Sequence, residues 1–234
     1  MSTHRNTSQQ GMTFIEAGSF LMGHQDADSR WPAHTVDLDA YWIDRYPVTN
    51  ADYEVFVKET GHEQPTHWIS DAYQPDMANH PTVYIPFDDA KAYAKWIGKR
   101  LPSEAEWEKA ARGTEGQSYP WGNSEAAERC NTNGDYGGTT PVDKFAAGAS
   151  PYGVMDMSGN VLEWVADWHG DYDTSEPNRN PVGPPTGKHR CTRGGHYDVL
   201  ARDARCASRH WNPPEKGQHH IGFRCAKNAS LGDS

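Results

Sequence analysis

The sequence predicts an α+β fold that is irregular and loop-rich, with few helices and short antiparallel strands. Its 234 residues include 9 tryptophans, 22 glycines and 16 prolines. Many aromatic side chains among many turn-forming residues favour a loop-rich fold with aromatic anchors over a helix bundle, and the aromatic content argues against disorder. Residues 113–190 are mostly Gly, Pro, Asn, Asp and aromatic residues. Backbone this irregular is usually ordered by bound metal or by many side-chain hydrogen bonds.

Four stretches have the hydrophobic pattern of strands. Residues 12–23 keep their apolar side chains on one parity around Gly18, which predicts a hairpin or a bent strand. Residues 36–44 alternate apolar and polar side chains and predict a further strand. The apolar run at 160–168 and the closing run at 221–226 predict two more.

Three helices are predicted from their N-terminal signals. Thr49 or Asn50 is placed to cap the first helix, and Asp88 to cap the second. The third begins with a capping box, in which the Ser103 hydroxyl accepts from the third helical amide and Glu106 reaches back to the cap. We therefore expect all three helices in the first half of the chain.

The chain length suits one large domain or two small ones. No internal repeat and no low-complexity linker divides the sequence. We therefore expect a flexible tail at residues 1–11, a single domain at 12–228 and a second tail at 229–234.

The charge and the polar N-terminus exclude several classes of protein. The net charge of −10 disfavours nucleic acid as a partner, because an acidic surface repels phosphates. No stretch is long and apolar enough to cross a membrane, and the first ten residues lack the apolar core of a signal peptide. We therefore expect a cytoplasmic protein with no membrane partner.

The four cysteines are Cys130, Cys191, Cys206 and Cys225, and no two of them form a C-x-x-C pair. In a cytoplasmic chain, dispersed thiols of this kind are usually reduced and buried. A structural disulfide remains open if the compartment is oxidising.

Seven strings occur in a fixed order along the chain. They are AGSFLMG (17–23), YPVTN (46–50), RLPSEAEWEKAAR (100–112), PWGN (120–123), YGVMDMSGNVLEW (152–164), RGG (193–195) and GFR (222–224). This order resembles the formylglycine-generating enzyme, or sulfatase-modifying factor, family from about residue 12 to 227. The resemblance implies a loop-rich fold with modest secondary structure that is related to C-type lectins.

The resemblance also implies a structural calcium site in the 156–163 loop. Its ligands would be a carboxylate or amide, two backbone carbonyls and a glutamate, which match Asp156, Gly159, Val161 and Glu163. Calcium takes six to eight hard oxygen ligands and accepts carbonyls from irregular backbone. The alternative is that Asp156 caps a turn and Glu163 pairs with an arginine.

A second calcium site of the family falls near residues 131–136. The matching residues are Asn131, Thr132, Asp135 and Tyr136. The spacing of the last two departs from the expected pattern, so a plain Asx-turn loop is the competing interpretation.

The family's named reaction is not expected from this chain. It oxidises a substrate cysteine with oxygen at a copper ion held by two thiolates, which suit copper(I) because both are soft. The family places these cysteines between the Arg-Gly-Gly string and an Arg-x-Ala-x-Arg string. Here that interval, residues 196–204, contains no cysteine. We therefore lean towards a protein that is not an enzyme.

The segment 196–220 predicts a display surface for a protein or small-molecule ligand. Framework-type residues recur along it, and chemically mixed residues lie between them. The candidate ligand-binding residues are Tyr197, Asp198, Leu200, Arg202, Asp203, His210, Trp211, Asn212, Gln218, His219 and His220. This alternation resembles the variable proteins of diversity-generating retroelements. An ordinary core loop with Trp211 packed inward is the competing interpretation.

An alternative function is a divergent metal-dependent oxidoreductase that acts on a thiol, peptide or small molecule. Six histidines fall late in the chain, and imidazoles bind iron or copper; they are His169, His189, His196, His210, His219 and His220. Some relatives are iron-dependent sulfoxide synthases, but they draw ligands from an extra N-terminal helical domain that we do not expect here. Surface or hydrogen-bonded histidines are the simpler interpretation.

Overall fold

The computed structural model describes residues 11–24, 31–68, 73–174, 178–230 and 232–233. Its α-helices within these ranges are α1 (Asn50–Thr60), α2 (Phe87–Trp96) and α3 (Glu104–Arg112). Its strands there are short: β1 (Met12–Ile15), β2 (Gly18–Met22), β3 (His34–Leu38), β4 (Tyr41–Asp44), β5 (Leu162–Trp168), β6 (Arg190–Arg193), β7 (Arg209–Asn212), β8 (Ile221–Phe223) and β9 (Ala226–Asn228). The predicted α+β, loop-rich fold is confirmed. No helix in these ranges is long and apolar enough to span a bilayer.

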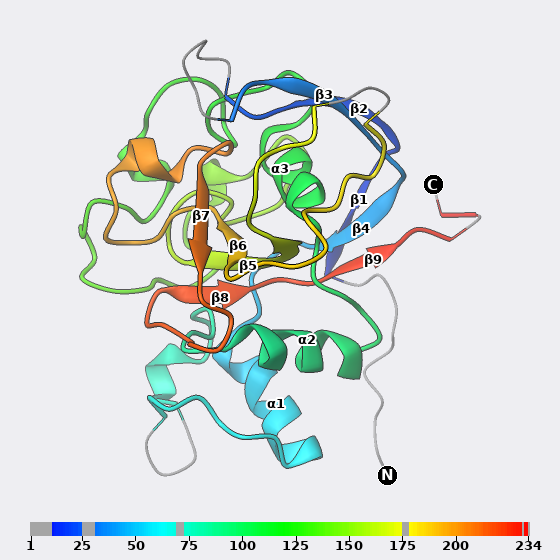
Figure 1. Cartoon of the computed structure of the whole chain (residues 1–234). Coiled ribbons are helices and arrows are strands. Elements are labelled where there is room, and N and C mark those ends of the chain that lie inside the picture. Colours follow the sequence, from blue (N-terminus) through cyan, green and yellow to red (C-terminus); the bar gives the residue numbers. More distant parts are fainter. Residues whose placement is uncertain (1–10, 25–30, 69–72, 175–177, 231, 234) are drawn as a thin grey trace.

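The central sheet has four strands in the order β7-β6-β5-β8. Its pairs are antiparallel except for β5 with β8, which are parallel. Strands β1, β4 and β9 form an antiparallel sheet of their own, and β2 pairs with β3. In Figure 1, α3 lies on one side of the central sheet, and α1 and α2 lie beyond β8 on the other.

Strand β5 separates two hydrophobic cores. Leu162 and Trp164 belong to the core formed with α1 and α2, whereas Val165 belongs to the core formed with α3 and the β2–β3 pair. This division follows from the alternation of side chains along a strand. It explains why residues 160–168 read as an almost continuous apolar run, since both faces of the strand are covered.

The strand predictions were right in position and incomplete in pairing. Residues 12–23 form the bent strand that was one of the two alternatives: β1 pairs with β4 and β2 pairs with β3, so the two halves do not form a hairpin with each other. Residues 36–44 form two strands, β3 and β4, instead of one. Residues 221–226 likewise divide between β8 and β9.

Two of the three predicted helix caps are confirmed. Thr49 and Ser103 each form a complete capping box at the start of α1 and α3. The prediction for α2 was wrong: Pro86 is the N-cap, and Asp88 lies in the first turn. Proline suits the start of a helix because its fixed φ matches and no amide is lost there.

A buried network of ion pairs attaches α3 to β6 and β7. The Glu104 carboxylate accepts from Arg209 Nε and Nη2, both at 2.7 Å. Glu108 pairs with Arg112 at 2.8 Å and also with Arg193. All five side chains are buried. Every charged group in the network therefore has at least one partner of opposite charge inside the protein, as buried charges require.

The ends of the chain contact the folded body where they are described. The predicted tail at 1–11 lies outside the described residues except for Gly11, whose carbonyl accepts the Arg45 amide at 3.0 Å. In the 229–234 segment, the Asp233 carboxylate accepts from Trp42 Nε1 at 3.1 Å.

Candidate functional site

All four cysteines are buried and free, as the sequence predicts for reduced thiols. Burial raises the pKa of the Cys206 thiol to about 12 and also raises that of Cys130. Thiols of this kind are protonated at neutral pH, whereas a metal ligand or nucleophile must be a thiolate. The structure therefore offers no reactive thiol pair near residues 196–204.

The two carboxyl groups of the 156–163 loop have different surroundings. Asp156 is buried, and burial raises the pKa of its carboxyl to about 7. Glu163 is fully buried as well, but its two oxygens accept from Arg224 Nε and Nη2 at 2.7 Å each and from Trp107 Nε1 at 2.9 Å. The Glu163 charge is thus matched by an arginine, which is the alternative that the sequence left open. Its role as a calcium ligand stays a prediction, as do those of Gly159 and Val161.

The 131–136 loop divides in the same way. Asn131 and Thr132 are buried, whereas Asp135 and Tyr136 are exposed on a turn. The Oδ1 atom of Asn131 is a buried acceptor without a hydrogen-bond partner in the structure, and an orphaned buried oxygen of this kind suits a calcium ligand. The roles of Asn131, Thr132, Asp135 and Tyr136 as calcium ligands stay predictions.

Asn160 joins the two loops to each other and to the 196–204 segment. Its side chain accepts from Asn131 Nδ2 at 3.2 Å and donates to Asp156 Oδ2 at 2.8 Å. Its backbone carbonyl accepts the Tyr197 amide at 3.1 Å. Both loops that the resemblance links to calcium therefore support the start of the predicted display surface.

The 131–136 loop also binds the display segment through backbone atoms. The Asn133 amide donates to the Val199 carbonyl, and the Gly134 amide donates to the Tyr197 carbonyl, both at 2.7 Å. Asn133 adopts a left-handed φ of 60°, a conformation that asparagine tolerates. The path of residues 197–199 is thus fixed by main-chain contacts.

The structure places all eleven predicted ligand-binding residues at the surface. Six are exposed, namely Asp198, Leu200, Arg202, Asp203, Trp211 and His219. Five are half-buried, namely Tyr197, His210, Asn212, Gln218 and His220. The residues interpreted as framework, including Ala201, Ala204 and Ala207, are buried. The alternation read from the sequence agrees with burial only in part, because Arg205 and Pro214, also interpreted as framework, are half-buried like five of the candidates.

Histidine and tyrosine rings form a continuous patch on this surface. We call it the imidazole patch; its residues are His67, Tyr84, His196, Tyr197, His219 and His220. His196 stacks on His220 with 4.2 Å between ring centroids, and the His219 ring lies 4.5 Å from that of His220. Tyr84 lies 6.3 Å from His219 and stacks on His67 at 4.8 Å. Burial, reinforced by neighbouring imidazoles, lowers the pKa of His196 and of His220 to about 4.

Tyr84 and His67 were missed by sequence reasoning because they come from the first half of the chain. Tyr84 has a left-handed φ of 60°, which is rare for a bulky residue. Gly217 packs directly against it, since a Cβ at 217 would lie 2.1 Å from the Tyr84 carbonyl. A strained residue held by a close backbone contact is a common feature of functional sites.

Trp211 is 43% exposed and does not pack into the core. Its ring lies 4.4 Å from the His169 ring and 6.2 Å from the Trp31 ring. The interpretation in which Trp211 packs inward is therefore not supported. Exposed tryptophan with one face covered is typical of binding surfaces.

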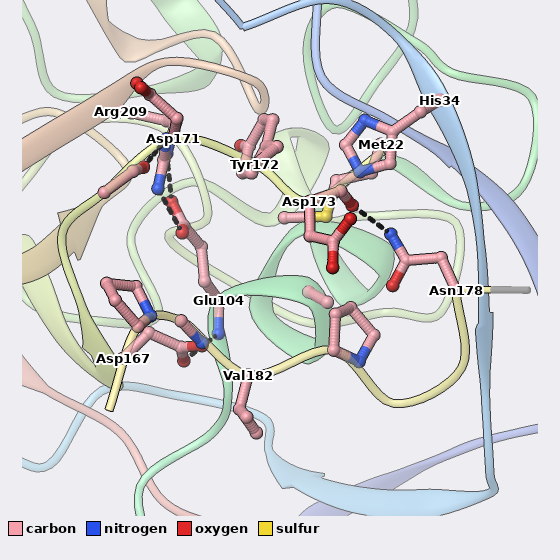
Figure 2. A pocket seen from close by; sticks show the side chains of 15 residues that line it. Met22, His34, Glu104, Asp167, Asp171, Tyr172, Asp173, Asn178, Val182 and Arg209 are labelled. Atoms are coloured by element: carbon pink, nitrogen blue, oxygen red, sulfur yellow. Dashed lines mark hydrogen bonds and ion pairs between the residues drawn. The ribbon is translucent and has the colours of Figure 1, made fainter. Parts of the chain in front are cut away.

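A small pocket, lined by none of the imidazole-patch residues, lies between the β2–β3 pair, the start of α3 and residues 167–173 and 178–184 (Figure 2). Two of its four acidic residues, Glu104 and Asp167, have structural roles. Glu104 is bound by Arg209, and Asp167 accepts the amides of Glu104 and Gly183 at 2.7 Å each. Burial, followed by the nearby Glu104 charge, raises the pKa of Asp167 to about 6. The pocket is thus a weaker candidate than the surface.

Metal ligation by several side chains is not apparent. Within the described ranges, no group of three or more His, Cys, Asp or Glu side chains is arranged to hold a metal ion. Four of the six late histidines of the alternative function lie in two places: His196, His219 and His220 in the imidazole patch, and His169 beside Trp211. Of the other two, His210 lies 3.1 Å from the Asp203 carbonyl through Nε2, and the His189 carbonyl accepts the His169 amide at 2.9 Å.

Comparison with known proteins identifies the family. The model of the sulfatase-modifying factor enzyme 1-like domain matches residues 1–229. The chain belongs to this family. It is 37% identical over 284 residues to a formylglycine-generating enzyme of Thermomonospora curvata, with 93% of each chain covered. The predicted family, with its C-type-lectin-like fold, is thereby confirmed.

Two further similar proteins carry names other than formylglycine-generating enzyme. The serine/threonine-protein kinase Pkn1 of Chlamydia trachomatis is 40% identical over 238 residues, and the match covers 93% of this chain but only 38% of the kinase. The structure of Treponema denticola variable protein 1 is 25% identical, with a TM-score of 0.78, and the match covers 93% of this chain and 95% of that one.

Proposed function

We propose that this member of the sulfatase-modifying factor family is a calcium-stabilised binding domain that does not generate formylglycine. The surface of residues 196–220 would bind a protein or a small molecule. The main support is that six of the eleven candidate residues are exposed and none is buried, whereas Ala201, Ala204 and Ala207 between them are buried. The likeness to a variable protein of Treponema denticola also favours this function. The proposal includes the version in which a retroelement diversifies the surface.

The absence of a reactive thiol pair argues against the copper chemistry named for the family. Every cysteine of the chain is buried, and burial raises the pKa of the Cys130 and Cys206 thiols. A thiolate pair at the surface would be needed to hold copper(I). We therefore assign the cysteines a packing role.

Calcium is proposed as a structural ion bound near Asn131 and Asp156. The orphaned Asn131 Oδ1 and the buried Asp156 carboxylate are hard oxygen atoms on two residues that both hydrogen-bond to Asn160. Calcium bound there would stabilise the loops that hold residues 197–199 in place. The ion would supply no reaction step.

The test compares the wild-type chain with a Leu200→Asp/Trp211→Ala variant on glycan and peptide arrays. Both side chains are exposed, so the variant should fold normally. A ligand that the wild type binds at least tenfold more tightly than the variant would support the proposal. Equal binding by the two proteins would place the ligand site elsewhere and contradict it.

The alternative function is a metal-dependent oxidoreductase that uses late histidines with iron or copper. The clustering of His196, His219 and His220 is the observation in its favour. Oxygen uptake by the iron- or copper-loaded chain with a cysteine-containing peptide would establish it and overturn the binding proposal.

A further inference from the structure

We propose that His219 and His220 form a binding site for a zinc-like divalent ion on the imidazole patch. This inference goes beyond the proposed function and does not depend on which ligand the surface binds. It rests on the relative position of two ring nitrogens, His219 Nε2 and His220 Nδ1, which lie 3.3 Å apart.

That separation is the one a tetrahedral ion requires. Zinc binds imidazole nitrogens at about 2.0–2.1 Å, so two such nitrogens on one ion lie about 3.3–3.4 Å apart. In the present contact one ring nitrogen carries a proton and the other accepts it. Moving that proton to the other nitrogen of the same ring would leave a lone pair on each of the two facing nitrogens, with no net release of protons. Small rotations of the two rings would then direct both lone pairs at one ion.

The two rings are mounted on ordered backbone. The His220 carbonyl accepts the Leu162 amide of β5 at 2.9 Å, and the Ile221 amide donates to the Gln218 carbonyl at 3.1 Å. The Gln218 side chain is itself held by Asn212 at 2.9 Å. A site that is fixed in this way loses less conformational freedom when it binds an ion.

Neighbouring rings restrict the pair further. His196 stacks on His220, and its Nδ1 accepts the Asp198 amide at 3.3 Å. Tyr84 and Tyr197 lie 6.3 Å and 6.1 Å from His219. Neighbouring rings therefore flank the His219–His220 pair on the patch, while His219 remains exposed to solvent.

Imidazole ligands favour zinc, copper and nickel over calcium or magnesium, which prefer oxygen. With only two protein ligands, the remaining positions of the ion are open to water or to an oxygen of a bound molecule. The site is thus chemically distinct from the oxygen-rich calcium loops around Asn160.

The test measures zinc binding at pH 7.5 by isothermal titration calorimetry on the full chain without an affinity tag. His219→Ala and His220→Ala are compared with the wild type, and His62→Ala is the control because that histidine pairs with Asp89 instead. We expect one zinc per chain, an affinity at least tenfold lower in each patch variant, and no more than a twofold change in the control. Circular dichroism checks that each variant is folded.

Imidazole ¹⁵N shifts provide a second measurement that does not depend on the variants. Zinc should shift the resonances of His219 and His220 in the wild type before those of other histidines. Wild-type affinity in the His219→Ala/His220→Ala protein, or zinc-induced shifts confined to other histidines, would overturn the inference. If the chain binds zinc at this site but binds no ligand on the glycan and peptide arrays, the result would count against the proposed function and not against this inference.

Discussion

Replacing Glu163 with glutamine tests how the buried charge at the C-terminal end of the 156–163 loop is balanced. Glu163 and Arg224 are both fully buried, and two hydrogen bonds of 2.7 Å join them. Removing one partner of such a pair costs about 3–5 kcal/mol, because the other charge stays buried. Arg224 keeps carbonyl acceptors at Asp44, Arg45 and Met155. We therefore expect a loss of unfolding free energy at the lower end, about 3 kcal/mol.

The assay is urea unfolding of wild type and Glu163→Gln, each with calcium and with a chelator. Glu54→Gln is the matched control, since its i,i+4 pair with the exposed Lys58 on the helix surface should contribute less than about 0.5 kcal/mol. If arginine pairing dominates, Glu163→Gln loses the same free energy in both conditions. Destabilisation of Glu163→Gln by less than about 1 kcal/mol would refute the reasoning. Loss of calcium stabilisation in Glu163→Gln, but not in the wild type or Glu54→Gln, would also refute it and make Glu163 a calcium ligand.

Three further predictions concern the pocket and the surface. Gly217→Ala should destabilise the fold by about 1–3 kcal/mol in thermal unfolding, because its Cβ would collide with the Tyr84 backbone; an unchanged melting temperature would contradict the close contact. Trp211→Ala should cost less than about 1 kcal/mol of stability, because the side chain is 43% exposed, yet weaken any array ligand at least tenfold, and a reversed pattern would show that the residue is structural. Asp167 has a pKa raised from 3.8 to about 6, so the folded state holds its proton more tightly than the unfolded chain. The resulting stability is present below about pH 4 and is lost as pH rises through 6, by up to about 3 kcal/mol. Asp167→Asn should flatten that slope in urea titrations, and an unchanged slope would assign it to other groups.

Local signals predicted the helices well because capping is decided within a few residues. Thr49 and Ser103 carry their partners three positions later in the sequence, so the caps can be read directly. Strand pairing depends on distant segments. Nothing in residues 12–23 indicates that β1 pairs with β4 while β2 pairs with β3, since both choices bury the same apolar side chains.

The surface was also predictable only in part. Alternation of framework and mixed residues identified the outward side chains of 196–220, because burial follows residue type. His67 and Tyr84 were not found, since they join the patch through ring contacts across more than a hundred residues of sequence. The pairing of Glu163 with Arg224 was foreseen only as an alternative, because a sequence gives no distance between loop and strand.

The main-chain bonds between residues 133–134 and 197–199 have a consequence for how the surface can evolve. The donors and acceptors in these two bonds are backbone atoms, which every residue except proline supplies in full. The side chains of Tyr197, Asp198 and Leu200 are therefore free to change without altering the path of the chain that carries them. Substitutions there would alter specificity at little cost in stability, so the scaffold tolerates diversity at the place where a new partner would be selected.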